Sequence, residues 1–204
     1  RIIMTSLSGI IREDMTFGSG DAVSLSGNVQ IASGYTVTFG PGSSLQGSSK
    51  EIEVFGSLVI SGTSTNLIEV EDIKIYGKEG GSTSINYSHV FSTVSGYYIT
   101  YTIVAGSEIY PTSKNDGNLT ISNSVIEIGT SSHRPLDLNS TSVVKGNIFN
   151  NTNITAYQQN TITLDSNTFI GTSTIDTFSG RGYWSTPLLT LKDNNFLSSA
   201  SQSL

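Results

Sequence analysis

A six-residue pattern recurs five times in the second half of the chain, and it constrains the fold more than any other feature. The pattern is an apolar residue, two unrestricted positions, a small polar residue, one unrestricted position and a second apolar residue. Its copies are Ile85-Ser88-Val90, Ile121-Ser124-Ile126, Val144-Asn147-Phe149, Leu164-Asn167-Phe169 and Leu191-Asn194-Phe196. The first residues of successive copies are 36, 23, 20 and 27 positions apart. Self-similarity at such intervals is typical of solenoids, in which each repeat forms one coil.

Each copy predicts two short strands that meet at a corner, with the polar residue at the corner. Asn suits this position because it tolerates the left-handed conformation and can hydrogen-bond neighbouring backbone. If the coils stack, Asn147, Asn167 and Asn194 align as a ladder of side-chain amides. The phenylalanines two positions later then form a second ladder inside the solenoid, made of Phe149, Phe169 and Phe196.

The first half of the chain shows a strand pattern without the six-residue copies. From Val23 onward, apolar residues alternate in short runs such as Tyr35-x-Val37-x-Phe39, and glycines such as Gly34 and Gly40 interrupt them. Period-two alternation between turn residues indicates strands, and no window shows a convincing helical period. Coils of about 20–27 residues would number about eight in this chain of 204 residues.

Two stretches carry a resemblance to a known family. Residues 27–42 read GNVQIASGYTVTFGPG, and residues 56–63 read GSLVISGT. A strand, a Gly, an alternating strand and Pro-Gly, followed by Gly-x-Leu-x-x-x-Gly-Thr, resembles right-handed parallel β-helix repeat proteins of the pectate-lyase-like fold. The resemblance covers roughly residues 23–197 and implies an all-β, right-handed parallel β-helix (solenoid) of about eight coils. The family spans adhesins, phage tailspikes, polysaccharide lyases and hydrolases, so it implies a fold and not an activity.

The chain divides into a leading segment and the helix. Residues 1–22 are expected to be an N-terminal cap, either a short helix or the strand by which the chain enters the solenoid, because an open solenoid end exposes strand edges. Residues 23–204 form the parallel β-helix. An elaborated loop or lateral hairpin is expected at about 92–118, where the interval between copies is longest and the turn signal Asn115-Asp116-Gly117 occurs.

Composition excludes several classes of function. The net charge is −6, and the ten basic residues are scattered without a patch, which disfavours a nucleic-acid partner. The absence of Cys excludes disulfides, a Cys-ligated zinc site and a thiol nucleophile. No apolar run approaches the ~18–20 residues of a membrane helix, so no membrane insertion is expected. Serine and threonine make up about 28% of the chain, as a solenoid exterior with few charges requires.

Two insertions concentrate the residues that favour a ligand-binding role. The candidate ligand-binding residues are Tyr97, Tyr98, Tyr101, Tyr110, Arg181, Tyr183 and Trp184. Aromatic rings supply contact area at a small entropic cost, and Arg binds a carboxylate or sulfate group. The alternative is structural: the tyrosines are half-buried strand residues and Trp184 packs against the adjacent coil.

No catalytic residue, metal site or cofactor is predicted. Glycoside hydrolysis requires paired carboxylates at a defined separation, and four aspartates of the second half each stand alone in their coil: Asp137, Asp165, Asp176 and Asp193. Only Asp165 and Asp193, at nearly equivalent positions one coil apart, are candidates to lie close together. The cluster of residues 132–137, which contains His133 and Arg134, is either catalytic, a site for an acidic sugar, or a Pro-containing turn with solvated charges. The calcium-binding loop patterns are missing.

Threonine pairs at alternate positions raise the possibility of an ice-binding face. The pairs begin at Thr36, Thr100, Thr161 and Thr172. The intervals between them are unequal, so we expect them at different coil positions, which argues against a flat lattice-matching surface.

The sequence therefore predicts a non-catalytic β-helix segment of a larger exported surface protein, such as an adhesin or stalk. It would display loops for carbohydrate or surface binding, outside the cell, at the cell surface or on the exterior of a virion. The alternative is a glycan-cleaving β-helix: a polysaccharide lyase, a glycoside hydrolase or a phage tailspike. Enzymatic activity is therefore left open, and the expected partner is a carbohydrate or cell-surface glycan.

Overall fold

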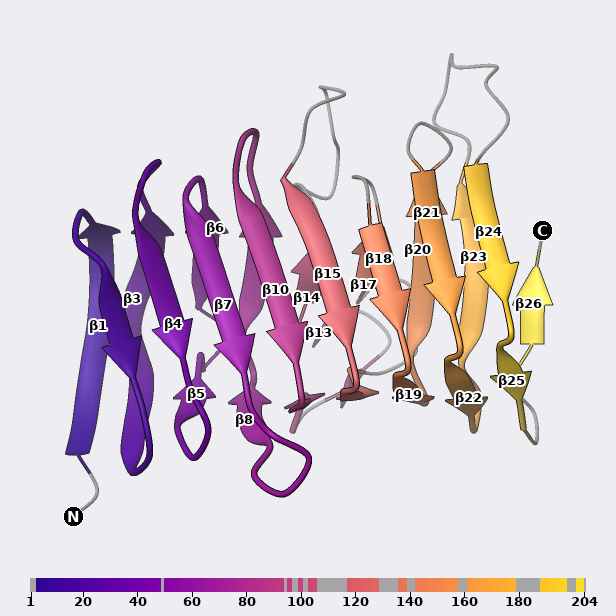
Figure 1. Ribbon diagram of the computed structural model, residues 1–204, viewed down its shortest axis with the longest axis horizontal. Helices are drawn as coiled ribbons and strands as arrows, with labels where there is room; N and C mark the ends of the chain where they lie inside the picture. Colours follow the sequence, from indigo (N-terminus) through magenta and orange to yellow (C-terminus); the bar gives the residue numbers. More distant parts are fainter. Residues whose placement is uncertain are drawn as a thin grey trace.

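The chain forms a stack of coils built from strands. The computed structural model describes residues 3–48, 50–93, 95–96, 99–100, 103–105, 117–128, 136–138, 142–157, 161–178, 188–197 and 201–203. Among these residues there are strands and corners but no helix. The coils follow one another along the long axis of the molecule, so that the two termini lie at opposite ends (Figure 1). The fold is a parallel β-solenoid, as the sequence predicted.

One side of the solenoid is an eight-stranded parallel sheet. In stack order its strands are β2 (Met15–Phe17), β4 (Thr36–Phe39), β7 (Ser57–Ser61), β10 (Ser82–Asn86), β15 (Asn118–Ser122), β18 (Ser142–Lys145), β21 (Thr161–Asp165) and β24 (Leu188–Lys192). Because each pair continues the register of the pair before it, one residue per strand aligns in a row along the whole sheet.

The other two sides belong to a sixteen-stranded sheet with two arms. The first arm holds β5 (Ser44–Gln46), β8 (Ile68–Glu71), β11 (Ser88–Phe91), β16 (Val125–Glu127), β19 (Ile148–Asn150), β22 (Thr168–Ile170) and β25 (Asn195–Phe196). The second arm holds β6 (Glu51–Val54), β9 (Lys74–Gly77), β14 (Ile103–Ala105), β17 (Leu136–Leu138), β20 (Asn153–Tyr157), β23 (Thr174–Phe178) and β26 (Ser201–Ser203). The arms join because the long strand β3 (Asp21–Ile31) pairs with both β5 and β6.

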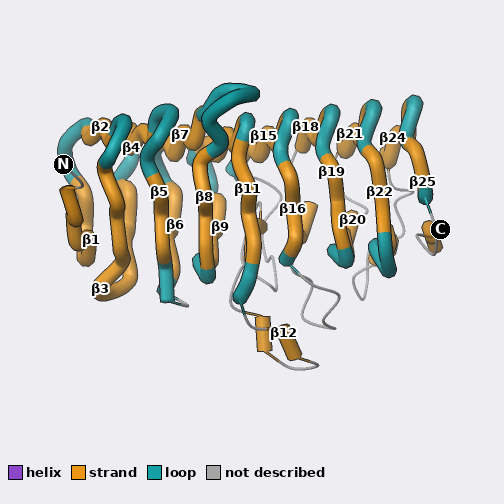
Figure 2. The backbone as a smooth tube through the Cα atoms, turned by 90° about the horizontal axis from the view of Figure 1, so that it is seen from below, coloured by secondary structure: helices purple, strands orange, loops and turns teal. Residues whose placement is uncertain are grey.

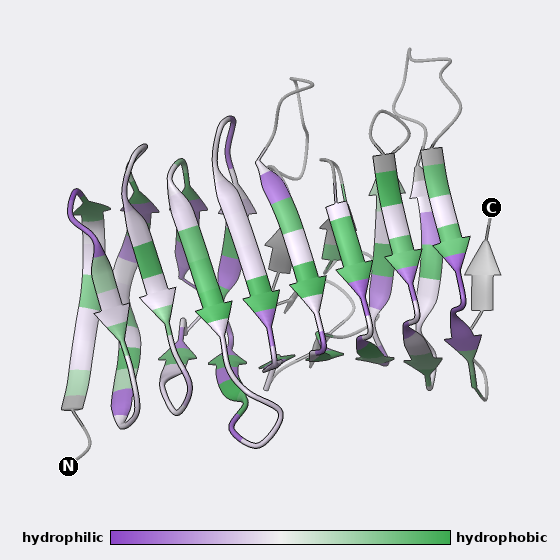
Figure 3. Cartoon of the chain, in the orientation of Figure 1, coloured by the Kyte–Doolittle hydropathy of each residue, from purple (hydrophilic) through white to green (hydrophobic). Residues whose placement is uncertain are grey.

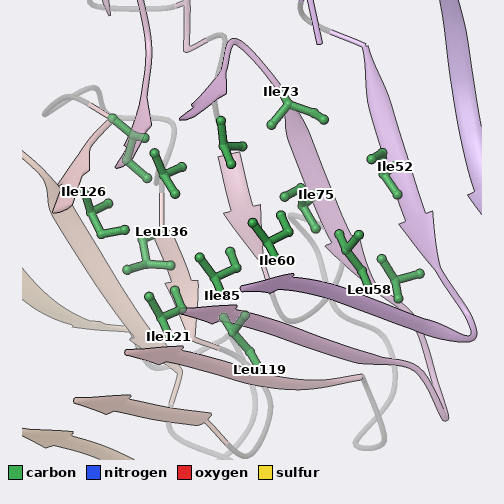
Figure 4. Close-up of a cluster of buried hydrophobic side chains, with 14 of the residues drawn as sticks. Ile52, Leu58, Ile60, Ile73, Ile75, Ile85, Leu119, Ile121, Ile126 and Leu136 are labelled. Atoms are coloured by element: carbon green, nitrogen blue, oxygen red, sulfur yellow. The ribbon is translucent and has the colours of Figure 1, made fainter. Parts of the chain in front are cut away.

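The core is a single column of apolar side chains enclosed by the three sides. Alternation along each strand points every second residue inward; in β7, for example, Leu58 and Ile60 are fully buried while the residues between them face outward. Successive strands stack like on like, as in the row Ile60, Ile85 and Ile121 (Figure 4). The buried residues form one continuous cluster. Each such side chain stabilises the fold by about 1.5–3 kcal/mol through burial. Figure 3 shows hydrophobic residues recurring along successive strands.

The Asn and Phe ladders predicted from the repeat are present. The backbone N–H of Asn147 donates to Oδ1 of Asn167 at 3.0 Å, and that of Asn167 donates to Oδ1 of Asn194 at 3.0 Å. The rings of Phe149 and Phe169 stack with centroids 5.0 Å apart. The ring of Phe169 lies 4.8 Å from that of Phe196. Each copy therefore places two strands at a corner, and the corners lie in register.

The conformation assigned to the polar corner residue was wrong. The left-handed residue is the one before it in every copy: Tyr87 (φ 47°), Asn123 (φ 50°), Gly146 (φ 68°), Ser166 (φ 56°) and Asp193 (φ 52°). A non-glycine residue pays roughly 1–2 kcal/mol for this conformation. The following polar side chain compensates, because it turns inward and binds backbone of the neighbouring coils. In Asn167, Nδ2 donates to the carbonyl oxygen of Val144 at 2.9 Å.

The N-terminal segment forms strands, and the predicted loop at about 92–118 contains a hairpin. Residues 3–17 contribute β1 (Ile3–Ile11) and β2, which pair in parallel with β3 and β4; of the two alternatives for this segment, the structure shows strand. In the predicted loop at about 92–118, β12 (Ser95–Gly96) and β13 (Ile99–Thr100) pair antiparallel, away from the coils (Figure 2). Within the same range, β14 returns to the second arm between β9 and β17.

Candidate functional site

The ligand-binding residues proposed from the sequence lie outside the residues that the structure describes. They are Tyr97, Tyr98, Tyr101, Tyr110, Arg181, Tyr183 and Trp184. The same holds for His133 and Arg134. Asp137 is placed by its backbone in β17, beside Thr155 of β20. Among the described residues, the candidates for a functional site are therefore side chains on the outer faces of the sheets.

The outer face of the eight-stranded sheet carries one uninterrupted row of small uncharged residues, which we call the outer row. From end to end it reads Thr16, Thr38, Val59, Ser84, Thr120, Val143, Thr163 and Thr190. Its members are half-buried or exposed, and Val143 is 45% exposed. Neighbouring parallel strands are about 4.8 Å apart, so the row presents β-branched groups and hydroxyls at a regular spacing along the rod.

The outer row overturns, for two of the four threonine pairs, the expectation that the pairs fall at different coil positions; of the other two pairs, Thr100 lies in β13 and Thr174 in β23 of the second arm. Thr36-x-Thr38 lies in β4 and Thr161-x-Thr163 in β21, and both pairs occupy the same position of the eight-stranded sheet. The unequal intervals arise in the connections, whereas pairing of the strands fixes their register. The signal was present in the sequence: the residue before the first apolar residue of the five pattern copies is always Ser, Thr or Val.

Charged residues lie beside the outer row toward the C-terminal end of the sheet, and Asp14 lies beside it at the N-terminal end, where its Oδ1 accepts a hydrogen bond from the backbone N–H of Thr36 at 2.8 Å. Lys145, Asp165 and Lys192 are in register on β18, β21 and β24, and Nζ of Lys145 lies 3.2 Å from Oδ2 of Asp165. The hydroxyl of Ser166, which donates to Oδ1 of Asp165 at 2.7 Å, and the Lys145 ammonium lower the pKa of Asp165. Asp165 is therefore held ionised and paired with protein groups.

Asp165 and Asp193, which the sequence placed at nearly equivalent positions one coil apart, occupy positions that differ by one residue. Asp165 is the last residue of β21 and aligns with Lys192 of β24. Asp193 is the left-handed corner residue that follows. Aligning the two copies on Asn167 and Asn194 matches Asp193 to Ser166 and not to Asp165. Asp165 therefore lies one residue further from the corner than Asp193 does.

A second cluster lies on the outer face of the first arm. Nε2 of His89 (β11) lies 2.7 Å from Oε2 of Glu127 (β16), and the side chains are 30% and 36% exposed. Nδ2 of Asn150 (β19) donates to Oε1 of Glu127 at 2.6 Å. The hydrogen bond from Asn150, and then that from His89, lower the pKa of Glu127, although partial burial acts in the opposite direction. The ring of His89 also stacks on Phe91, with centroids 4.6 Å apart.

The geometry of the cluster of His89, Glu127 and Asn150 favours a structural role, in which the three side chains link neighbouring coils. Both oxygens of Glu127 accept hydrogen bonds from protein donors, and one face of the His89 ring is taken by Phe91. A carboxylate can orient an imidazole for general base catalysis. Here Glu127 also accepts a hydrogen bond from Asn150, so its two oxygens connect β16 to both neighbouring strands, β11 and β19. The cluster was missed because its members are 38 and 23 residues apart in the chain, and only the coil register brings them together.

Within the described ranges, no group of three or more His, Cys, Asp or Glu side chains is suited to hold a metal ion. The same part of the chain contains no helix long and apolar enough to cross a membrane. No family model matches the sequence, and neither a curated protein nor a solved structure gives a significant match.

Proposed function

We propose that this chain is a non-catalytic, rod-like module of a larger exported surface protein, such as an adhesin or stalk, which presents insertions for carbohydrate binding. The observation that supports the proposal is the unbroken coil stack. Parallel pairing runs from β2 to β24 in one sheet and from β1 to the ends of both arms in the other. A rod of this kind holds binding segments at a fixed distance and orientation.

The ladders support the rod by linking coils at the corners as well as along the strands. Asn147 and Asn167 are almost fully buried, and each bridges the coils on both sides of it. Buried amides with satisfied hydrogen bonds rigidify and specify a core. Bending the rod would therefore break side-chain bonds in a low-dielectric interior and not only exposed contacts.

The binding part of the proposal rests on the segments that connect the strands. Tyr110 belongs to the connection between β14 and β15, and Trp184 to that between β23 and β24. The core pattern does not constrain such connections, so they are free to carry aromatic rings and an Arg. Aromatic residues cover the face of a sugar ring with little loss of side-chain entropy.

A glycan array with the native protein and the double variant Tyr98→Ala, Trp184→Ala tests this function. We expect glycan binding by the native protein and its loss in the double variant, with unchanged circular dichroism. Phe55→Ala, which removes a half-buried ring from a regular corner, is the control and should retain binding. Equal binding by native protein and double variant, or no binding by either, would contradict the carbohydrate proposal. Release of new sugar ends from a bound glycan would instead favour the glycan-cleaving alternative.

The outer row favours a second candidate function, which is adsorption to ice. A row of Thr, Ser and Val without a charged member offers methyl groups and hydroxyls at a repeat fixed by the strands, and a rigid sheet loses little entropy when it binds a flat lattice. Partitioning of the protein into growing ice tests the idea. Lys at Thr120 and Thr163 (T120K, T163K) should abolish partitioning, whereas Ile148→Lys on the first arm, where Ile148 is 42% exposed, should not. Exclusion of the native protein from ice would contradict it.

A further inference from the structure

The outer face of the eight-stranded sheet differs from the other faces in charge and in side-chain size. On its four middle strands, β4, β7, β10 and β15, all the outward residues are described, and they are Ser, Thr, Val or Asn. The outer faces of the two arms carry charged side chains instead, such as Glu69 on β8 and Lys74 on β9. Depletion of charge is a property of the centres of protein interfaces.

The outer row on this face reads almost the same from both ends. From β2 to β10 its residue types are Thr, Thr, Val and Ser, and from β24 back to β15 they are Thr, Thr, Val and Thr. Val59 and Val143 therefore lie equally far from the midpoint of the eight strands, which falls between β10 and β15. A row of this kind matches itself when it is turned end over end, as a two-fold axis requires of an interface.

The row of outward positions two residues further along each strand is complementary to itself in size. Toward the C-terminal end it carries Lys145 on β18 and Asp165 on β21. At the same distances from the midpoint on the other side, the positions are Ser61 on β7 and Gly40 directly after β4. If the sheet is turned about an axis along its strands, the long charged side chains of one copy lie over the smallest positions of the other. Like charges of the two copies then stay apart, which avoids a repulsion that disfavours association.

The face has the area that a specific dimer needs. Eight strands about 4.8 Å apart and up to five residues of about 3.3 Å each cover roughly 38 Å by 16 Å. Two such faces in contact bury on the order of 1,200 Å², which is at the lower end of the range for specific interfaces. The contact would also cover Val143, which is 45% exposed in the single chain.

From these observations we propose that a second copy of this chain docks on the outer face of the eight-stranded sheet. The two-fold axis runs along the strands between β10 and β15, so the two rods lie antiparallel and sheet to sheet. Val59 of each copy packs against Val143 of the other, and Ser84 faces Thr120. This interface goes beyond the proposed function, because it gives the rod a lateral contact that does not involve the insertions.

The test is a charge exchange between the two valines, followed by analytical ultracentrifugation. We expect the native protein to be a dimer at about 50 μM. Val143→Lys alone and Val59→Glu alone each place an unpaired charge against a valine of the other copy, so each should weaken association at least about tenfold. In the chain with both substitutions, each new carboxylate faces a new ammonium group of the other copy, and dimerisation should return. Ile148→Lys, at a residue that is 42% exposed on the first arm, is the control and should remain dimeric.

The double variant makes the test specific for the arrangement. Its dimerisation would show that both substitutions are compatible with the fold, so loss of the dimer in the single variants could not be attributed to unfolding. With parallel rods each valine would face its own counterpart, and the double variant would stay monomeric.

Three outcomes would overturn the proposal. One is a native protein that is monomeric at about 1 mM, whether it partitions into ice or not; partitioning would assign the face to ice instead. Another is association of the Val143→Lys variant as strong as that of the native protein. The third is a double variant that is folded by circular dichroism and fails to regain the dimer.

Discussion

The two halves of the solenoid build the same corner in different ways. Between the eight-stranded sheet and the first arm, the N-terminal half uses glycine at Gly62, where a Cβ would lie 2.3 Å from the carbonyl oxygen of Tyr87 and 2.8 Å from that of Asn66. At the corner one coil earlier the buried Ser43 bonds within its own coil, donating its hydroxyl to the carbonyl oxygen of Gly40 at 2.7 Å. The C-terminal half uses a buried polar side chain at the equivalent corner, as in Asn167. At Gly62 the backbones approach too closely for a side chain, whereas at the later corners a polar side chain occupies the space and binds the backbone of a neighbouring coil.

This difference explains why the repeat is visible only in the second half. A ladder is specified by side chains that must be present in every coil, so it leaves a recurring pattern. A glycine corner is specified by the absence of a side chain, and 21 glycines in the chain make it hard to distinguish from ordinary turns. A second ladder, at the corner between the arms, follows the same rule: the backbone N–H of Thr152 donates to Oγ of Ser173 at 3.0 Å.

Phe169→Ala should have the largest effect, because Phe169 is fully buried between two other rings. Loss of the ring and the cavity it leaves should lower the free energy of unfolding by about 3–5 kcal/mol. Denaturant unfolding measures this, with Ile148→Ala, a partly exposed neighbour, as the control. A loss below about 1 kcal/mol would mean that the ring stack does not stabilise the C-terminal half.

Asn167→Ala should come next, because it leaves the backbone N–H of Asn147 and the carbonyl oxygen of Val144 without their partners. Two buried groups without hydrogen bonds should cost about 2–4 kcal/mol. The exposed Asn118→Ala, on the eight-stranded sheet, should change stability by less than about 0.5 kcal/mol. If both variants change the melting temperature equally, the side-chain ladder does not stabilise the C-terminal half.

Gly62→Ala probes the N-terminal form of the corner. The added Cβ meets backbone and not the end of a flexible side chain, so the strands must shift, at a cost of about 1–3 kcal/mol. Gly18→Ala is the control, since a Cβ there meets nothing within 4 Å. If Gly62→Ala is as stable as the native protein in urea, close backbone approach does not specify this corner.

Thr83→Val should raise stability where the two halves meet. Thr83 points inward from β10, is 2% exposed, and its hydroxyl is the one buried side-chain polar atom without a partner in the described part of the chain. Replacing it with a methyl group of the same size should stabilise the fold by about 1 kcal/mol. Thr83→Ser keeps the hydroxyl and removes the methyl, so it should destabilise. A higher melting temperature for the Ser variant than for the Val variant would contradict this reasoning.

The smallest expected effect is a pH dependence at the first arm of the C-terminal half. The pKa of Glu127 is lowered in the folded state by Asn150 and His89, so its contribution to stability is present above the unfolded value of about 4.5 and is lost as pH falls through the folded value. Glu127→Gln should flatten the change in melting temperature between pH 6 and pH 3 in this region. Glu69→Gln, at an exposed residue on the same face, is the control and should leave the profile unchanged. If the native protein and E127Q have identical profiles, Glu127 does not contribute to the pH dependence of stability.

The sequence alone determined the fold class, the corners of the second half and both ladders. These features depend on which residue types recur at short spacing, because a corner and its two strands are local. Val37 and Phe39, which the sequence placed in one alternating run, are both buried for the same reason, since alternation within a strand puts every second residue on one face.

Only the tertiary structure decided which distant residues share a face. The outer row and the contact of His89 with Glu127 depend on how coils of unequal length stack, and the 36-residue interval between the first two copies obscures this in the sequence. Strand pairing keeps the register while the connections absorb the extra length. Packing also decided which corner residue is left-handed. The polar side chain that binds the neighbouring coil is buried, and the residue directly before it adopts the left-handed conformation.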